Sequence, residues 1–348
     1  MRHNILRTMT VAAMAAIVPW GVHAAGLSFS EGLSQFNVIV LGDAQVNSHV
    51  DGRTYVGGNL TGTGDFVQHP NGLASSSYSG LTVMGNAKFN SVNGLGTYVG
   101  GNLTGGNVNS GAARIKGNVS NSNINGSSKA AIGGTIKSSN INAGQLSGSN
   151  KTSALNSAAA VASSTDFSTV FNQGSSFLSG LKDTGGSVVF SNNNSKVTFN
   201  AKAGADGLAV FNLSSIDDKV FAAGEFSFNL NGAKGIIFNS DNAKITISAN
   251  FLNGSASLGN QMLWNFYKAT DVTLNNQFGG SIVATNAKLT NNNNIEGTVV
   301  VKTLYQNGEI HSDPFCEPIP SIPEPSTYAL MALGVAMVSL VAAKRRSA

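Results

Sequence analysis

The nonapeptide TYVGGNLTG stands at residues 54–62 and returns unchanged at residues 97–105. Its core, two apolar residues four apart around a glycine, recurs in VMGNA, VGGNL, IKGNV and IGGTI, which begin at Val83, Val99, Ile115 and Ile132. The steps between these four copies are 16, 16 and 17 residues. A repeat of this length is too short for a propeller blade or an ankyrin unit and is typical of one coil of a β-solenoid.

Glycine and asparagine occupy the positions where such a coil must turn. Both tolerate the positive φ angles of tight corners, while alternate residues of the short strands point inward and stack on their equivalents in neighbouring coils. The tetrapeptide SNIN occurs twice and places Asn123 and Asn140 at equivalent points of consecutive coils, as a ladder of asparagine side chains requires. The chain is rich in glycine and only 11% charged, but its short β-branched clusters argue against disorder. The sequence therefore predicts a parallel β-helix over residues 36–150.

One segment has the apolar spacing of a helix instead of a strand. The three-and-four spacing of one helical face is shown by Phe167, Val170, Phe171, Phe177, Leu178 and Leu181, and Thr165 with Asp166 offers an N-cap. The helical segment is predicted to span about 153–183. Gly185 and Gly186 are expected to end the helix. We predict one long amphipathic helix that packs alongside the solenoid and covers apolar surface. A surface for dimerisation is the alternative use of the same face.

Strand-like alternation returns after the helix, from Ser187 to the motif GTVVV that begins at Gly297. Asparagine and glycine again supply the turns between the strands. We therefore predict that residues 26–315 form one mostly β domain, a single solenoid whose coils come from both sides of the helix. Two separate β-domains are the alternative.

The N-terminus has the layout of a secretory signal peptide, assigned to residues 1–24. Arg2 and Arg7 precede an apolar stretch, and small residues mark a cleavage site between Ala24 and Ala25. The apolar stretch is shorter than the about 20 residues of a spanning helix, which disfavours a permanent N-terminal anchor. We expect the protein to be exported.

The C-terminus carries a second targeting signal, beyond a stalk at residues 316–322. An apolar run at 328–343, predicted to be a transmembrane helix, is followed by basic residues and is typical of a stop-transfer segment. Four residues precede this run: Pro323, Glu324, Pro325 and Ser326. The order resembles the PEP-CTERM sorting signal, here at residues 323–348, which implies processing by an exosortase in a Gram-negative bacterium that makes extracellular polysaccharide. The resemblance implies only transient anchoring in the inner membrane, and a plain membrane anchor is the alternative.

The net charge does not point to nucleic acid. The formal charge of +4 includes two basic residues of the signal peptide and three of the tail, and without these, 16 basic residues face 17 acidic ones. The exported body is therefore close to neutral, and the isoelectric point near 9.1 is no argument for a nucleic-acid partner. The single cysteine, Cys316, excludes an intramolecular disulfide and leaves an intermolecular bridge, a lipid attachment or an unpaired stalk thiol.

Two segments near the ends of the β-rich region resemble the choice-of-anchor A family. They are NVIVLGDAQVNSHVDGRTYVGGNLTG at 37–62 and the stretch 263–315, which contains LWNFYKATDVTL and NGEIHSDPF. The resemblance spans residues 26–315 and implies a bacterial surface protein with an adhesive or matrix role, whose relatives share a body but differ in their anchoring tails. It implies no enzymatic activity, and we assign no catalytic residue. The stretch VATN at 283–286 departs from the alanine and proline common in that family.

The densest polar cluster of the first half is Asp43, His49, Asp51 and Arg53. Because Ca²⁺ favours oxygen ligands from acidic loops, Asp43 and Asp51 are candidate metal ligands, and calcium is the one cofactor considered. Their spacing matches no established ligand pattern. An ordinary turn at Asp51, or a buried ion pair with Arg53, is the structural alternative.

A second cluster, Glu296, Glu309, His311 and Asp313, lies near the end of the β-rich region. Stacked coils would bring Glu296 near His311, and paired carboxylates in a groove are typical of hydrolases and lyases that act on polysaccharides. Such an enzyme on a β-helix scaffold is the alternative to an adhesive function. The sequence contains no nucleophile elbow, phosphate loop or HExxH motif in its support.

Sugar binding and ice binding are two further uses of a β-helix. Trp264, Phe266 and Tyr267 could stack on pyranose rings, but strand alternation places Tyr267 opposite the other two, so at least one set belongs to the core. An ice-binding face needs a flat array of threonines, which are too scattered along this sequence to predict one. We expect an exported adhesin or biofilm component of the outer surface or extracellular matrix. It would bind extracellular polysaccharide or other surface proteins through many weak contacts along its coils.

Overall fold

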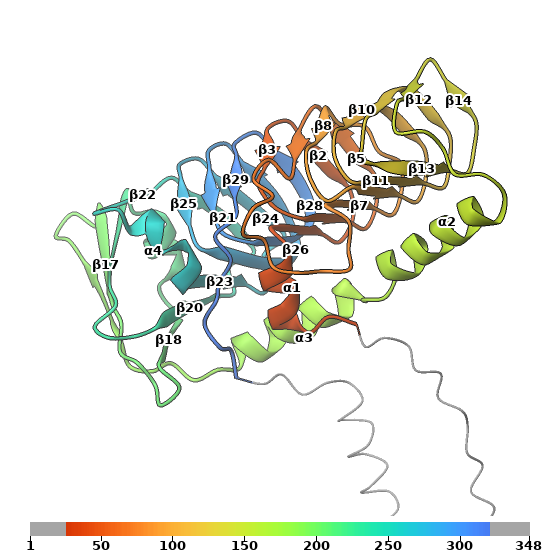
Figure 1. Cartoon of the computed structure of the whole chain (residues 1–348). Helices are drawn as coiled ribbons and strands as arrows, with labels where there is room; N and C mark the ends of the chain where they lie inside the picture. The colour runs from red at the N-terminus through yellow and green to blue at the C-terminus, as the bar shows by residue number, and fades with distance from the viewer. Residues whose placement is uncertain (1–25, 321–348) are drawn as a thin grey trace, which may run out of the picture.

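The computed structural model describes residues 26–320, which form one elongated β-solenoid (Figure 1). A coil supplies up to three short strands, as β1 (Val38–Val40), β2 (Ala44–Val46) and β3 (His49–Val50) do. The predicted signal peptide, the sorting signal and the transmembrane helix at 328–343 lie outside the described residues. Within residues 26–320, no helix has the length and the apolar character needed to cross a bilayer.

The first half of the chain builds coils from the middle of the solenoid toward one end. Its further strands are β4 (Thr54–Val56), β5 (Leu60–Gly62), β6 (Asp65–Phe66), β7 (Leu81–Val83), β8 (Ser91–Val92), β9 (Thr97–Val99), β10 (Leu103–Val108), β11 (Ala112–Ile115), β12 (Val119–Ile124), β13 (Ser128–Ile132), β14 (Ile136–Lys137) and β15 (Asn140–Ile141). The strand pairing confirms the predicted repeat, because adjacent strands align Val83, Val99, Ile115 and Ile132. The predicted ladder is also present: Asn140 pairs with Asn123 and donates its side-chain amide to the Asn123 side chain.

The second half begins at the opposite end and returns to the middle. Its elements are β16 (Ser187–Phe190), β17 (Lys196–Asn200), β18 (Leu208–Asn212), α4 (Asp217–Phe221), β19 (Glu225–Asn229), β20 (Gly235–Ser240), β21 (Lys244–Ile247), β22 (Asn250–Phe251), a 3-10 helix (Ser255–Gln261), β23 (Met262–Phe266), β24 (Asp271–Leu274), β25 (Phe278–Gly279), β26 (Ser281–Asn291), β27 (Ile295–Glu296), β28 (Val299–Gln306) and β29 (Ile310–His311). β16, β17, β19 and β22 form a separate four-stranded sheet, in which β16 and β17 are antiparallel. β18, β20, β23, β26 and β28 follow one another toward the middle in a shared sheet.

The two halves meet where β28 lies beside β1. Val38 pairs with Thr54 of the next coil on one side and with Val299 on the other. β2 pairs with β28 and β3 pairs with β29 in the same way. We call this junction the seam. The strand pairing therefore joins the halves into one continuous solenoid, with coils from both sides of the helical segment.

The helical segment differs from the single helix predicted at about 153–183. It forms two helices, α2 (Gly148–Ala162) and α3 (Phe167–Ser179). Asp166 is the N-cap of α3, as predicted, and its carboxylate accepts the backbone N–H of Thr169. Because serine, threonine and aspartate favour caps over helix interiors, the polar run between the two helices ends one and begins the next.

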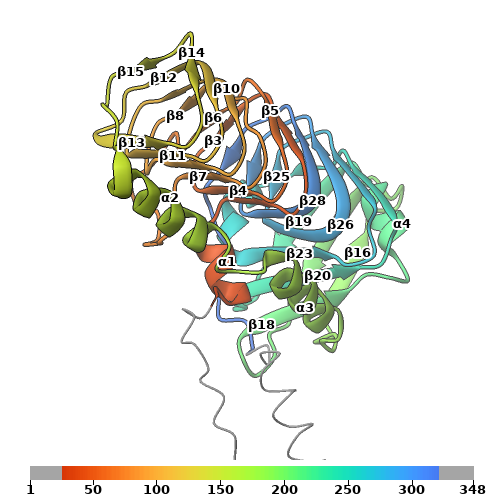
Figure 2. The same cartoon turned by 90° about the vertical axis from the view of Figure 1, so that its right-hand side faces the viewer.

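The helices carry the chain back along one side of the solenoid (Figure 2). α2 packs against β9, β11 and β13, whereas α3 packs against β20, β23, β26 and the short N-terminal helix α1 (Phe29–Gln35). The predicted amphipathic cover is α3, whose Phe171 and Leu178 are fully buried against the outer side of the sheet. α2 is mostly exposed and buries only Leu155 and Ala162.

A row of asparagines docks α3 on the sheet. Asn212, Asn239 and Asn265 are aligned in β18, β20 and β23 and are joined by bonds between their side-chain amides. Asn265 accepts the hydroxyl of Ser175 at 2.6 Å and donates to the Ser175 carbonyl at 2.9 Å. Asn239 donates to the carbonyl of Leu178 at 2.8 Å. Because a buried amide without partners is costly, these bonds determine where α3 lies.

Candidate functional site

One side of the solenoid lies away from α1, α2 and α3 and is built from both halves of the chain (Figures 1 and 2). Its outward side chains are mostly polar. Strand pairing aligns its outward side chains in two rows. The first row is Lys244, Asp271, Lys288, Thr303, Asp43, Asn59, Asn86, Asn102 and Asn118. The second row is Thr246, Thr273, Thr290, Tyr305, Gln45, Thr61, Lys88, Thr104 and Ser120. We call these two rows the polar face.

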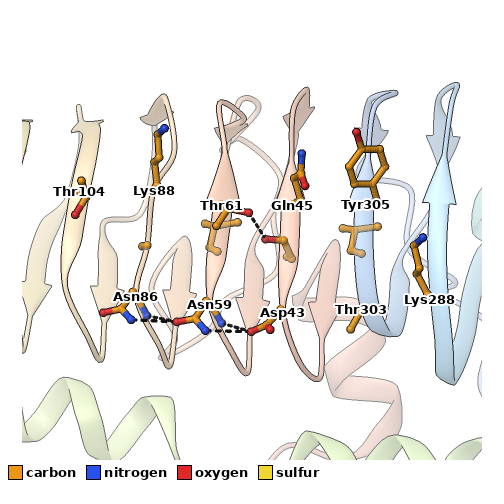
Figure 3. A pocket seen from close by; sticks show the side chains of 14 residues that line it. Asp43, Gln45, Asn59, Thr61, Asn86, Lys88, Thr104, Lys288, Thr303 and Tyr305 are labelled. Atoms are coloured by element: carbon orange, nitrogen blue, oxygen red, sulfur yellow. Dashed lines mark hydrogen bonds between the residues drawn. The ribbon is translucent and has the colours of Figure 1, made fainter.

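A side-chain ladder holds the part of the first row from Asp43 to Asn118 in place at one corner of the coils (Figure 3). Oδ1 of Asp43 accepts the backbone N–H of Asn59 at 2.7 Å. Oδ1 of Asn59 accepts the backbone N–H of Asn86 at 3.0 Å, and Oδ1 of Asn86 accepts the backbone N–H of Asn102 at 2.9 Å. The glycine before each asparagine is required by this stacking, since a Cβ at Gly85 would overlap Oδ1 of Asn59. The repeated Gly-Asn pair therefore encodes a row of side chains fixed by the neighbouring coil.

The second row brings together threonines that are far apart in the sequence. Thr246, Thr273 and Thr290 occupy equivalent positions of three consecutive coils. Their spacing along the chain is irregular, so the alignment is not evident in the sequence alone. Tyr305 and Gln45 follow Thr290 and interrupt the threonines. The scattered threonines thus align further than expected, but the row is not a continuous threonine array.

A groove of about 650 Å³ crosses the polar face at the seam (Figure 3). Tyr305 lies in it with 37% of its surface exposed. Lys88 and Lys288 are exposed beside it, and neither makes an ion pair with any residue in the described range 26–320. Amide, carboxylate and hydroxyl groups of Gln45, Asp43 and their neighbours complete the lining. An aromatic ring among such groups is suited to a sugar, because the ring packs on the apolar side of a pyranose while the polar groups bond its hydroxyls.

A second amide ladder runs along the edge of the polar face and crosses the seam. Asn292 donates to Asn275 at 3.1 Å, Asn307 donates to Asn292 at 3.0 Å, and Asn47 donates to Asn307 at 3.4 Å. Sequence reasoning identified the ladder at Asn123 but missed this one. The reason is that its last step joins residues from opposite ends of the chain, which no repeat period connects.

The structure gives the two candidate calcium ligands different surroundings. Asp43 is exposed on the polar face and supports the first row. Asp51 is buried at another corner of the coil. Its carboxylate contacts Nδ1 of His69 at 2.6 Å and accepts the backbone N–H of Ser312 at 3.3 Å. Calcium binding by Asp43 and Asp51 stays a prediction.

The alternative of an ion pair between Asp51 and Arg53 is wrong. The Arg53 guanidinium turns away from Asp51 and donates to the carbonyls of Ala74 at 2.6 Å and Tyr78 at 3.3 Å. Burial lowers the pKa of Arg53. The residue thus ties down the loop between β6 and β7 instead of neutralising Asp51.

The second predicted cluster is assembled at the seam. Glu296 and His311 face each other across β27 and β29, and Nδ1 of His311 lies 2.9 Å from Oε2 of Glu296, which confirms the predicted proximity. Nε2 of His311 lies 2.9 Å from Oε2 of Glu309. His49, from the first half of the chain, lies 3.4 Å from the other oxygen of Glu309. Parts of the two sequence clusters therefore meet in the fold: His49 and Asp51 of the first lie with Glu296, Glu309 and His311 of the second.

Burial and charge act in opposite directions on this cluster. Burial by itself lowers the pKa of His311, but hydrogen bonds to Glu309 and Glu296, together with the charges of Glu296 and Asp51, raise it above its ordinary value. The carboxylate of Asp313 binds outside this cluster, because it accepts the backbone N–H of Asn260 at 3.0 Å. Burial raises the pKa of Asp313.

The aromatic residues singled out in the sequence belong mostly to the core. Trp264 and Phe266 are buried, and Nε1 of Trp264 donates to the carbonyl of Gly279 at 3.0 Å. Tyr267 is half-buried. The exposed aromatic residue of the polar face is Tyr305, which sequence reasoning missed. Strand alternation was the available signal, because its neighbour Leu304 points inward.

Two family models match the chain. One is described as "Putative Ice-binding-like adhesive domain" and matches residues 29–312, which include the polar face and the seam. The other is the PEP-CTERM protein-sorting motif, which matches residues 321–346 and confirms the sorting signal predicted from the sequence.

No curated protein matches the chain. Among solved structures, the chain is similar to an ice binding protein from an Antarctic bacterium Flavobacteriaceae. The identity is 11% and the TM-score is 0.28, over 83% of this chain and 99% of that one.

Proposed function

We propose an adhesive function for this chain, which belongs to the family of ice-binding-like adhesive domains. Its PEP-CTERM motif marks an exported, cell-surface protein of Gram-negative bacteria that an exosortase-type enzyme processes. We infer that the solenoid is an adhesin or biofilm component whose polar face binds extracellular polysaccharide. The choice-of-anchor A assignment agrees with this role and stays a prediction.

The observation that supports the proposal most directly is the exposed ring of Tyr305 in a polar groove on a rigid scaffold. The side-chain ladder holds Asp43, Asn59 and Asn86, on one side of the groove, before any ligand arrives. Little entropy of these three side chains is then lost on binding, which favours affinity. The rows continue over many coils, so a polymer lying along the face would make repeated weak contacts that add up.

The affinity of the protein for two polysaccharides, one acidic and one neutral, tests this proposal. Alginate serves as an acidic probe and dextran as a neutral one, with dissociation constants measured by affinity gel electrophoresis. We expect Tyr305→Ala to weaken binding by about fivefold or more, the effect of removing a central contact residue. Lys88→Ala should weaken binding of alginate more than of dextran. Val189→Ala is the control, because Val189 is 52% exposed and lies on β16, outside the polar face. Equal binding by the wild type and Tyr305→Ala would exclude the groove as the adhesive site.

We propose that the protein is not an enzyme, and the alternative can be tested at the seam. A hydrolase or lyase would use Glu296 and Glu309, and His311 lies between these carboxylates with both ring nitrogens engaged. Polymer length after incubation, measured by size-exclusion chromatography, should not change. Shortening that Glu296→Gln abolishes would establish the enzyme instead.

A further inference from the structure

Three metal-ligating side chains converge at the seam, away from the two rows of the polar face. One ligand atom from each of His49, Glu309 and His311 can be chosen so that all three lie within 4.8 Å of one another. Glu309 lies between the two imidazoles, 3.4 Å from Nδ1 of His49 and 2.9 Å from Nε2 of His311. The two rings are stacked with their centroids 5.9 Å apart. We propose that these three residues bind a divalent transition metal ion, with Zn²⁺ as the best fit.

The remaining nitrogen of each imidazole supports this assignment. Nδ1 of His311 lies 2.9 Å from Glu296, and Nε2 of His49 lies 3.6 Å from Asp51. Metal-ligating histidines almost always offer their second nitrogen to a carboxylate, a carbonyl or water, which fixes the tautomer and the ring orientation. His311 has a carboxylate within hydrogen-bond distance in that position, and His49 has one at 3.6 Å, just beyond that distance. Nε2 of His311 and Nδ1 of His49 are thereby the nitrogens directed at the ion.

The outer carboxylates are themselves held in place. Gln277 donates its amide to Glu296 at 2.8 Å. Asp51 contacts His69 at 2.6 Å and accepts the backbone N–H of Ser312. A ligand set with anchored outer partners loses little freedom when an ion binds, because its geometry is largely set beforehand.

The ligand types select the metal. Two imidazoles and one carboxylate suit Zn²⁺, which also accepts four-coordinate geometry with water in the fourth position. Ca²⁺ prefers six or more oxygen ligands and would gain little from two nitrogens. The side chains of His49, Glu309 and His311 are 25%, 38% and 30% exposed, so an ion and its water can enter from solvent.

The position of the site gives the ion a structural consequence. His49 belongs to β3, in the first half of the chain. His311 belongs to β29, in the second half, and Glu309 directly precedes that strand. An ion held by all three joins the first and second halves across the seam. Because such a site does not exist in the unfolded chain, binding stabilises the closed solenoid.

Calorimetric titration tests the site. The exported protein is produced without a polyhistidine tag, stripped with EDTA, freed of the chelator, and titrated with zinc chloride and, separately, calcium chloride. We expect one Zn²⁺ to bind per chain in the zinc titration, and no binding of Ca²⁺ to this site in the calcium titration. His49→Ala and Glu309→Gln should weaken Zn²⁺ binding at least tenfold. Glu296→Gln should weaken it by about 10–100-fold, the usual effect of losing an outer partner.

Glu225→Gln is the matched control, because Glu225 lies on β19 in the separate four-stranded sheet, outside the cluster. Zn²⁺ should raise the melting temperature of the wild type and of Glu225→Gln, and leave that of His49→Ala and His311→Ala unchanged. Glu309→Gln keeps the shape of the side chain, so a loss of Zn²⁺ binding in this variant would not be due to misfolding. The absence of stoichiometric Zn²⁺ uptake, or uptake equal in the wild type and both ligand histidine variants, would overturn the proposal.

Discussion

Val38, in the first coil of the chain, pairs in parallel with Val299, in the last. Each half of the solenoid would otherwise present an open sheet edge at the seam, and such edges invite aggregation. The pairing protects both edges at once. It also places the groove of the polar face and the histidine cluster at the same junction, so the candidate sites exist only when both halves are present.

The first half should therefore be unstable alone. Residues 26–150, expressed without the rest of the chain, would expose the edges of β1, β2 and β3. We expect this fragment to aggregate or remain unfolded, as measured by circular dichroism and size-exclusion chromatography. Co-expression with residues 151–320 should recover a soluble complex. A folded, monomeric fragment 26–150 would show that the seam is dispensable.

Asn265→Leu should be strongly destabilising. The substitution leaves the hydroxyl and carbonyl of Ser175 and the side-chain oxygen of Asn239 without their partner. A buried polar group without a partner costs about 1–3 kcal/mol, so we expect a loss of at least about 2 kcal/mol in the free energy of unfolding. Urea denaturation measures it. Asn275→Ala is the control, because Asn275 belongs to an exposed ladder and should change stability by less than about 0.5 kcal/mol.

Gly174→Ala should destabilise the protein although alanine favours helices. A Cβ at this position in α3 would overlap the ring of Phe29 from α1. The clash should exceed the helix-propensity gain of about 1 kcal/mol, so the melting temperature falls. Ser176→Ala, at an exposed position of the same helix, should leave it nearly unchanged. A higher melting temperature for Gly174→Ala would mean that α1 and α3 are not in close contact.

Asp43→Asn should be almost neutral for stability. Asparagine occupies the equivalent place in the next coils, where its Oδ1 accepts the same backbone N–H, as Asn59 does for Asn86. Asp43→Ala removes the acceptor for Asn59 and should cost about 0.5–1.5 kcal/mol. Both values follow from urea denaturation. Equal losses for the two variants would indicate that the charge of Asp43, and not its place in the ladder, matters.

The N-cap of α3 should make the free energy of unfolding depend on pH in the acidic range. Hydrogen bonds from the Thr169 side chain and backbone hold the pKa of Asp166 below its ordinary value of 3.8. A lowered pKa in the folded state means that the charged cap stabilises the protein above pH 3.8 and that this contribution is lost as the pH falls through the folded pKa. Asp166→Ala should cost about 0.5–2 kcal/mol at neutral pH. Asp166→Asn caps the helix without titrating. The difference in the free energy of unfolding between the wild type and this variant, measured by urea denaturation at a series of pH values, should shrink as the pH falls.

Features that are encoded within a few neighbouring residues could be predicted from the amino-acid sequence. The repeat that begins at Val83 predicted the coils, because each inward residue stacks on its equivalent one coil away. The asparagine pair Asn123 and Asn140 and the cap at Asp166 were also evident, since ladders and caps depend on local spacing and residue type. The sorting motif is read as a contiguous signal and needs no fold. The division into α2 and α3 was missed because the alanine-rich run at 154–162 also favours a helix, and the predicted helix was extended through the cap at Asp166.

Only the tertiary structure decided which coils are neighbours and therefore where the sites lie. The chain starts in the middle of the solenoid, runs to one end, crosses to the other along α2 and α3, and stacks back to its own beginning. Tyr305 thus lies beside Gln45, and His311 beside His49, although no periodicity relates their positions. The physical reason is that the first coil leaves one edge of each strand unpaired, and the hydrogen bonds of those edges are satisfied only by the last coil of the chain.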